Sequence, residues 1–315
     1  MKNKILFLIF FLFFHTNAQW RYKDFDVSMG KGTKYYRILM RKERCLYGKH
    51  VYCQSSLKEL YNLFKNMFDV NNLSVKKVKP RTSIPKIIHQ IWVGGPLPEK
   101  YKLLQYTWMK MHPDWEYKLW TDEDAKTFDM RNREFYAKAT NYGEKADIFR
   151  YEILQKYGGL YVDIDFECLA PFDDLNENYE FYTGVGNVDQ KYLSVKNGLI
   201  ASIPDHPILE HCIENIKESA KLHKVVMRTG PIHFTKSFIY GVQNLVNKYE
   251  YQHIIALPAS YFYPIGVKER NMRGQELEEK LKKYPEAYGI HYWDSNWLEG
   301  REQIIGYDSE KPRIE

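Results

Sequence analysis

The segment from residue 145 to 167 constrains the fold more than any other part of this 315-residue chain. Its first part, residues 145–157, repeats apolar side chains at helical spacing, and Gly158-Gly159 then forms a natural C-terminal stop. Residues 160–167 alternate strictly between apolar and polar side chains, which predicts a strand with one buried face. A helix that leads through a tight turn into a strand is typical of α/β proteins.

The alternation in residues 160–167 predicts that Asp163 and Asp165 share the polar face with Tyr161, their backbones about 7 Å apart. Two such carboxylates repel each other unless water or a cation screens them. Carboxylate oxygens suit hard divalent ions such as Mn²⁺ or Mg²⁺, which also bind diphosphate oxygens. Two further Asp-x-Asp pairs, Asp24/Asp26 and Asp122/Asp124, lack this strand context, and we predict that both are solvated.

The preceding helix carries Asp147 and Arg150, three residues apart on one face. Two interpretations are open: a surface ion pair of little energetic value, or a clamp that binds sugar hydroxyls and phosphate. The spacing alone favours the surface pair.

The chain from residue 84 onward alternates short apolar runs with helical patterns. Residues 86–93 and 116–120 predict strands, with a helix between them, and an earlier amphipathic helix is expected near residues 57–68. This order predicts an α/β fold with a mostly parallel central sheet, and in such sheets ligands bind beyond the carboxyl ends of the strands.

Four ordered segments, 84–92, 113–117, 146–151 and 158–165, resemble the Asp-x-Asp sugar-transferase family. That family includes the Golgi initiating mannosyltransferases and is distantly similar to the glucosyltransferase domains of large clostridial toxins. The resemblance spans about residues 84 to 300. It implies a Rossmann-like catalytic domain of the GT-A type.

The resemblance also implies roles for individual residues. The catalytic set would be Asp163, Asp165, Arg150 and Asp147. The donor would be bound by Trp92, Asp147, Arg150, Tyr161, Asp163, Asn197 and Trp297, with Trp92 stacking on the nucleotide base. The metal ligands would be Asp165, Asp163 and His291.

The expected function is metal-dependent transfer of a hexose from a UDP- or GDP-linked donor to a glycan, glycolipid or protein hydroxyl, with retention of the anomeric configuration. Three other classes stay open: a metal-dependent phosphohydrolase, a non-catalytic protein that binds carbohydrate or nucleotide sugar, and a secreted effector that glycosylates host proteins. The formal charge of +6 is spread thinly and includes no long Lys/Arg block, so we expect no nucleic-acid partner.

The N-terminus predicts entry to the secretory pathway. Lys2 and Lys4 precede a ten-residue apolar run, and residues 1–18 resemble a signal peptide, the alternative being a short membrane anchor. Either way we expect an ER or Golgi lumenal or secreted protein, not a cytosolic one. The expected organisation is an extension over residues 19–83, the catalytic domain over 84–300 and a tail over 301–315.

Four cysteines fit an oxidising compartment. Cys45 and Cys53 would close a small loop, whereas Cys168 and Cys212 either pair or stay as buried thiols. One sequon, Asn72-Leu73-Ser74, is available for N-glycosylation.

Overall fold

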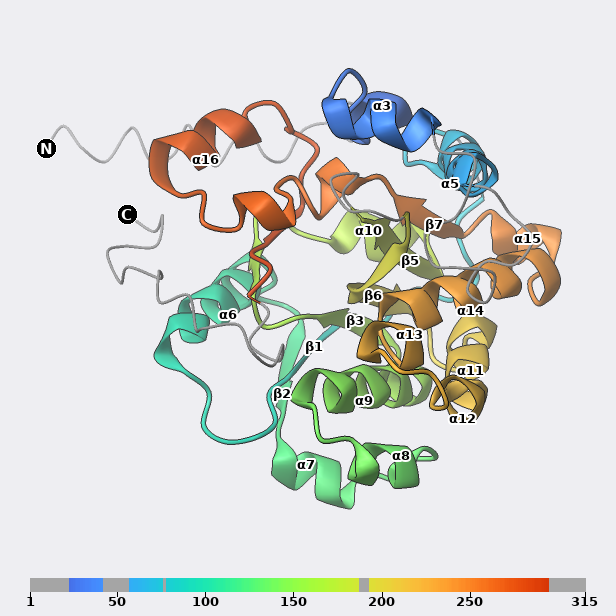
Figure 1. Cartoon of the computed structure of the whole chain (residues 1–315), viewed down its shortest axis with the longest axis vertical. Helices are drawn as coiled ribbons and strands as arrows, with labels where there is room; N and C mark the ends of the chain where they lie inside the picture. The colour runs from blue at the N-terminus through green and yellow to red at the C-terminus, as the bar shows by residue number, and fades with distance from the viewer. Residues whose placement is uncertain (1–22, 42–56, 76–77, 187–192, 295–315) are drawn as a thin grey trace, which may run out of the picture.

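The computed structural model of the chain describes residues 23–41, 57–75, 78–186 and 193–294 (Figure 1). A six-stranded sheet forms the centre, in the order β2 (Glu116–Trp120), β1 (Ile87–Ile91), β3 (Gly159–Val162), β6 (Val195–Ser202), β5 (Phe181–Val185) and β7 (Ile254–Leu257). Strand β6 runs antiparallel to β3 and β5, and the other neighbouring pairs are parallel. The predicted α/β fold with a mostly parallel sheet is therefore confirmed.

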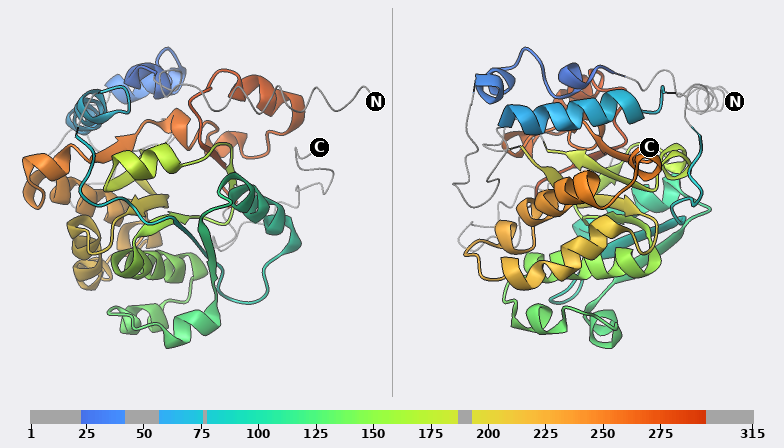
Figure 2. Two further views of the ribbon diagram at one scale, coloured as in Figure 1. Left: turned by 180° about the vertical axis from the view of Figure 1, so that it is seen from behind. Right: turned by 90° about the vertical axis from the view of Figure 1, so that its right-hand side faces the viewer.

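Helices cover both faces of this sheet. One face carries α9 (Tyr142–Tyr157), α11 (Pro207–Glu214) and α14 (Pro231–Asn244), and the other carries α5 (Leu57–Asn71), α6 (Glu99–Met111) and α10 (Asp173–Asn178), as the views in Figures 1 and 2 agree. A second, two-stranded sheet joins β4 (Phe166–Cys168) to β8 (Gly289–His291).

The remaining elements are short. They are α2 (Phe25–Ser28), α3 (Lys34–Arg41), α7 (Asp122–Thr127), α8 (Arg133–Lys138), α12 (Ile216–Ser219), α13 (Val225–Arg228), α15 (Lys248–Tyr251), α16 (Gly274–Leu281) and the 3₁₀ turns Ala259–Tyr261 and Val267–Glu269. Within the described ranges, no helix is both long and apolar enough to cross a membrane.

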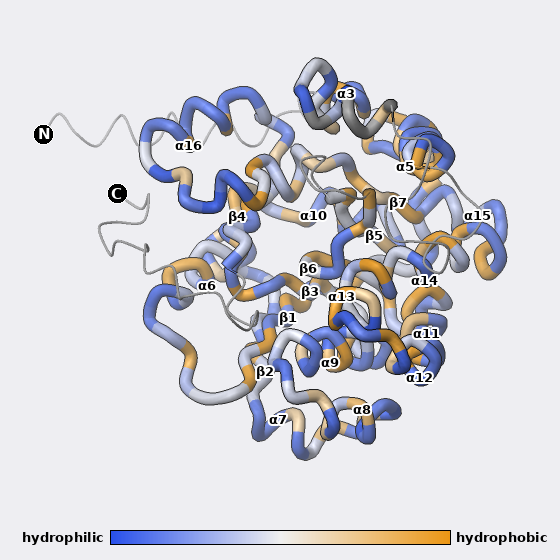
Figure 3. Tube along the Cα trace, viewed as in Figure 1, coloured by the Kyte–Doolittle hydropathy of each residue, from blue (hydrophilic) through white to orange (hydrophobic). Residues whose placement is uncertain are grey.

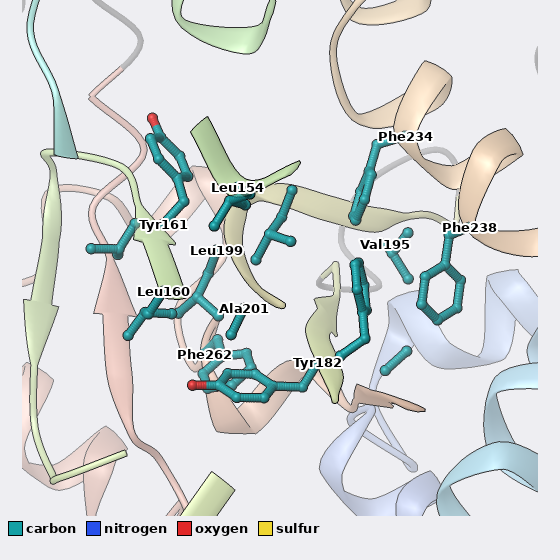
Figure 4. Packing of buried hydrophobic residues seen from close by; sticks show 14 of the residues in the cluster. Leu154, Leu160, Tyr161, Tyr182, Val195, Leu199, Ala201, Phe234, Phe238 and Phe262 are labelled. Atoms are coloured by element: carbon teal, nitrogen blue, oxygen red, sulfur yellow. The ribbon is translucent and has the colours of Figure 1, made fainter. Parts of the chain in front are cut away.

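The core lies between the sheet and its helices. Figure 4 shows Leu160 of β3 and Leu199 of β6 in the same packed cluster as Phe234 and Phe238 of α14. Hydropathy follows the layers, because the central strands are largely apolar and the outer turns of the helices are polar (Figure 3). Strands covered on both faces bury side chains of both parities, and β3 and β6 are buried at every position.

This double coverage explains where the predicted strand over residues 160–167 is wrong. Strand β3 ends at Val162, and the Asp163 carbonyl accepts a hydrogen bond from the Phe166 N–H at 3.2 Å, which turns the chain before β4 begins. Tyr161, which was expected on the polar face of the strand, is buried, and Ile164, which was expected in the core, is half-buried. The alternation therefore spans a strand, a turn and a second strand.

The other predicted elements agree more closely with the structure. Strand β2 covers residues 116–120 as expected, and α9 ends at Gly158, whose φ of 63° lies in the left-handed region that favours glycine. Helix α5 forms where the amphipathic pattern was found and packs beside β7, with the Phe64 ring 6.3 Å from that of Phe238. The boundary at residue 84 stays a prediction.

Cys168 and Cys212 are free, buried thiols. Cys45, Cys53 and the predicted signal segment 1–18 lie outside the described residues. The side chain of Asn72 is buried, and its Nδ2 donates to the Phe68 carbonyl at 2.8 Å. A glycan on that nitrogen has no room in this fold, so the sequon is unsuited to report on the compartment.

Candidate active site

The candidate site lies at the carboxyl ends of β1 and β3. The turn that follows β3 carries Asp163 and Asp165, and β6, which runs the other way, brings its first residues to the same edge. The small sheet completes the site, because Phe166 of β4 pairs with His291 of β8 and sets that histidine beside Asp165.

Three side chains form a group suited to a cation. Oxygen atoms of Asp163 and Asp165 and a nitrogen of His291 all lie within 4.8 Å of one another. The His291 Nε2 is 3.0 Å from Asp165 Oδ1 and 3.9 Å from Asp163 Oδ2, and its ring stacks on Phe166 with centroids 4.6 Å apart. Two carboxylates and an imidazole are a donor set that Mn²⁺ accepts, so the residues present fit a divalent cation.

The Arg150 guanidinium lies next to this group and is only 4% exposed. It is 3.0 Å from Asp147 Oδ1 and donates to Asp163 Oδ1 at 3.0 Å and to the Asn197 carbonyl at 2.6 Å. It also lies over the Tyr161 ring, 4.4 Å from the centroid. The surface ion pair that the spacing favoured is therefore wrong, since this pair is buried at the edge of the sheet.

Asp147 is bound from two further segments. Its Oδ1 accepts a hydrogen bond from Asn197 Nδ2 at 2.7 Å, and its Oδ2 accepts one from Thr229 Oγ1 at 3.1 Å. Burial raises the pKa of Asp147 to about 6, although Arg150 opposes the shift. The structure thus brings together Asp147, Arg150 and Asn197, three of the residues to which the resemblance assigns donor contacts.

The two central carboxylates differ in their ease of ionisation. Burial raises the pKa of Asp163, with Arg150 opposing the shift and Asp165 adding to it. Burial would also raise the pKa of Asp165, but His291 and the backbone N–H of Asp294 outweigh it and lower that pKa. The Tyr161 hydroxyl donates a hydrogen bond to Asp163 Oδ1 at 2.8 Å and helps to fix the position of that carboxylate.

Trp92 follows directly after β1 at the same edge. Its backbone N–H donates to the Trp120 carbonyl at 2.9 Å, and its ring centroid is 5.2 Å from that of Tyr101. The side chain is half-buried, and its Nε1 has no hydrogen-bond partner among the described residues. A buried indole N–H usually has an acceptor, which makes this nitrogen an exception within the described part of the chain.

Glycine is required where β6 passes the acidic turn. A Cβ built on Gly198 would lie 2.6 Å from Asp163 Oδ2, so a larger residue there would displace the carboxylate. Sequence reasoning did not find this role, nor that of Asp294, whose N–H donates to Asp165 Oδ2 at 2.7 Å across 129 positions. Trp297, the last predicted donor residue, lies outside the described residues.

As predicted, no side chain of the other two Asp-x-Asp pairs is buried, but each carboxylate also has a structural partner. Asp24 caps α2 through the Val27 N–H, Asp26 accepts from the Tyr61 hydroxyl, Asp122 accepts from the Gly94 N–H, and Asp124 accepts from the Thr121 N–H at the start of α7.

Comparison with known proteins places this geometry in a family. A family model described as a glycosyltransferase sugar-binding region containing the DXD motif matches residues 98–182, which include Asp147, Arg150, Asp163 and Asp165. The chain is also 32% identical over 194 residues to an uncharacterized glycosyltransferase of Acanthamoeba polyphaga mimivirus, covering 58% of this chain and 74% of the relative. The chain belongs to this DXD glycosyltransferase family.

Two relatives in the family come from Schizosaccharomyces pombe. Inositol phosphoceramide mannosyltransferase 2 is 31% identical over 241 residues, covering 74% of this chain and 63% of its own length. The initiation-specific alpha-1,6-mannosyltransferase is 25% identical over 292 residues, covering 73% of this chain and 70% of its own. The chain thus spans less than two thirds of the length of the first of these relatives. The second match confirms the resemblance to initiating mannosyltransferases.

Proposed function

We propose that the protein is a metal-dependent glycosyltransferase that moves a hexose from a nucleoside diphosphate sugar to a hydroxyl acceptor. The observation that carries the proposal is that a cation-binding group and a buried ion pair meet at the carboxyl ends of β1 and β3. The cation group of Asp163, Asp165 and His291 shares Asp163 with the buried Arg150–Asp147 pair. A nucleoside diphosphate sugar needs a cation for its diphosphate and, at the same time, polar side chains that position its sugar.

The donor sugar we propose is mannose, carried on GDP or, as the alternative, a hexose on UDP. The names of the two S. pombe relatives support mannose, and the first of them supports an inositol phosphoceramide or similar glycolipid acceptor. A glycan or protein hydroxyl is the other acceptor class. Retention of the anomeric configuration is part of the proposal because the family resemblance implies it.

The chain's own residues would divide the work of binding. Trp92 would stack on the base, and the free lone pair of Asp147 Oδ2 would accept a hydrogen bond from a sugar hydroxyl next to Thr229. Arg150 would keep Asp147 and Asp163 ionised and fixed in position. A Mn²⁺ or Mg²⁺ ion held by Asp163, Asp165 and His291 would neutralise the charge on the departing nucleoside diphosphate.

The compartment we propose is the lumen of the ER or Golgi, or the exterior after secretion, with membrane association through the N-terminus only in the alternative in which residues 1–18 stay as an uncleaved anchor. The support is the signal-like segment 1–18. Expression of the full chain in eukaryotic cells, followed by N-terminal sequencing of the product, tests this. A chain that keeps Met1 and fractionates with cytosolic proteins contradicts it.

The function is tested with a panel of radiolabelled nucleotide sugars, including GDP-mannose, UDP-glucose and UDP-galactose, with and without Mn²⁺ and a glycolipid acceptor. We expect labelled acceptor with one donor only, dependent on Mn²⁺, and no product from Asp165→Asn. Nucleotide release without an acceptor product would indicate a hydrolase. Donor binding by thermal shift without any turnover would indicate a binding protein.

A further inference from the structure

The carboxylate of Asp294 joins the end of β8 to the first turn of α6. Its Oδ2 accepts a hydrogen bond from Lys100 Nζ at 2.5 Å and one from the Tyr101 hydroxyl at 2.7 Å. The Lys100–Asp294 pair is about one-third exposed on both sides. Such a pair contributes little to global stability, but two donors on one oxygen fix the position of the segment that carries it.

The same segment surrounds Asp165. The Asp294 N–H donates to Asp165 Oδ2 at 2.7 Å, and the Tyr292 N–H donates to the Asp165 carbonyl at 3.1 Å. His291 contacts the other carboxylate oxygen. Residues 291–294 therefore contact both oxygens of the Asp165 carboxylate, through the His291 side chain and the Asp294 N–H, and also hold its backbone through the Tyr292 N–H.

The backbone between these N–H groups is strained. Trp293 has a φ of 56°, a left-handed conformation that non-glycine residues seldom adopt. Such a conformation persists only where the surrounding structure enforces it. The Trp293 indole donates to the Ile265 carbonyl at 2.9 Å, and the Asp294 side chain is held by α6 on the other side of the strained residue. Without the second hold, the Asp294 N–H would be free to leave Asp165.

We propose that Asp294 is a positioning residue for the cation site, clamped by Lys100 and Tyr101 so that its backbone N–H orients the Asp165 carboxylate. This inference rests on the proposed function for its purpose, but the positioning itself is a property of Asp165. Tyr101 also contacts Trp92, so the clamp joins the aromatic side of the site to its acidic side. Groups that orient a metal ligand usually affect metal affinity by about 10-fold or more.

The test measures Mn²⁺ binding directly, from the loss of the free-ion signal in electron paramagnetic resonance, with Mn²⁺ alone and with Mn²⁺ plus GDP. The variants are Asp294→Ala and Lys100→Met in the full chain. Lys86→Met is the matched control, because Lys86 also forms an ion pair with an aspartate, Asp173, at 2.7 Å. Lys86 directly precedes β1 and so lies at the amino end of that strand, away from the candidate site at its carboxyl end.

We expect the Mn²⁺ dissociation constant to rise about 10-fold in Asp294→Ala and in the same direction by less in Lys100→Met. The control should match the wild type, and thermal melts should show all three variants folded. If Asp294→Ala proves unfolded, Lys100→Met decides the question alone. Unchanged Mn²⁺ affinity in a folded variant overturns the proposal, as does a wild type that binds no Mn²⁺ under either condition.

The readout keeps the two proposals apart. A wild type that binds Mn²⁺ in a clamp-dependent way but transfers no hexose would contradict the proposed function and leave the positioning role intact. In an active enzyme, we expect the Mn²⁺ concentration for half-maximal rate to rise in Asp294→Ala, with kcat recovered at saturating Mn²⁺. A kcat loss that Mn²⁺ does not recover would overturn the role.

Discussion

Replacing Gly198 by alanine tests whether the position of Asp163 matters for activity. The added Cβ would lie 2.6 Å from Asp163 Oδ2, whereas ordinary contact begins near 3.4 Å, so the atoms must separate by roughly 0.8 Å (3.4 − 2.6). Asp163 has little freedom to yield, because Arg150 and Tyr161 hold its Oδ1 and its N–H donates to the Gly198 carbonyl at 2.8 Å. The strain therefore falls on the carboxylate of the cation group.

A displacement of about 1 Å at a reacting centre costs about 100-fold in rate, and overpacking costs about 1–3 kcal/mol of stability. We expect Gly198→Ala to lower kcat/KM for transfer by roughly that factor while the protein stays folded. Initial rates over a range of donor and Mn²⁺ concentrations, with thermal denaturation alongside, measure both quantities.

Gly241→Ala provides the matched control. There the added Cβ would lie 2.5 Å from Ile208 Cγ1, in the contact between α14 and α11 and away from the acidic turn. We expect a comparable loss of stability with kcat/KM per folded molecule unchanged. If Gly198→Ala keeps activity within about threefold of the wild type, the close approach of β6 does not set the position of Asp163 and the reasoning fails.

Four further outcomes are expected. Asp165→Asn should abolish transfer and Mn²⁺ activation without unfolding the chain, and an active variant that still needs Mn²⁺ would move the site elsewhere. Trp92→Ala should raise the donor KM by the equivalent of about 1–3 kcal/mol, whereas a lower melting temperature at unchanged KM would make it a core residue. Because burial raises the pKa of Asp147 to about 6, transfer should decline as the pH falls below that value. For the same reason the folded state holds this proton more tightly than the unfolded state. The unfolding free energy of the wild type relative to Asp147→Asn should therefore fall as the pH rises from about 4 to about 6, and denaturant titrations across that range check the sign.

The local patterns predicted the elements near the site, because short-range periodicity and glycine stops decide them. Strand β2 and helix α9 formed where the residues indicated, and the pair Asp163/Asp165 lies at the edge where a parallel sheet binds ligands. The exact course of residues 160–167 was not predictable, since both faces of β3 are covered and alternation no longer reports a single buried face.

Contacts across long sequence separations account for the rest. No spacing rule connects Asp165 with His291 or Asp294, and only the family resemblance drew attention to the segment that contains them. The burial of Asp147 and Arg150 was not predictable either, because their spacing is that of an ordinary surface pair. Only the packing of β6 against α9 shows that water is excluded from this pair.

The packing of α5 has a consequence for where this protein can be cut. Phe64 and Phe68 of that helix are fully buried, against Phe238 of α14 and Tyr261 after β7, so α5 packs into the same hydrophobic core as the catalytic sheet. A truncated chain that starts at residue 84 would expose this aromatic seam to solvent and invite aggregation. Helix α5, which the sequence pattern placed in a separate extension over residues 19–83, thus shields the edge strand β7 from pairing with other chains.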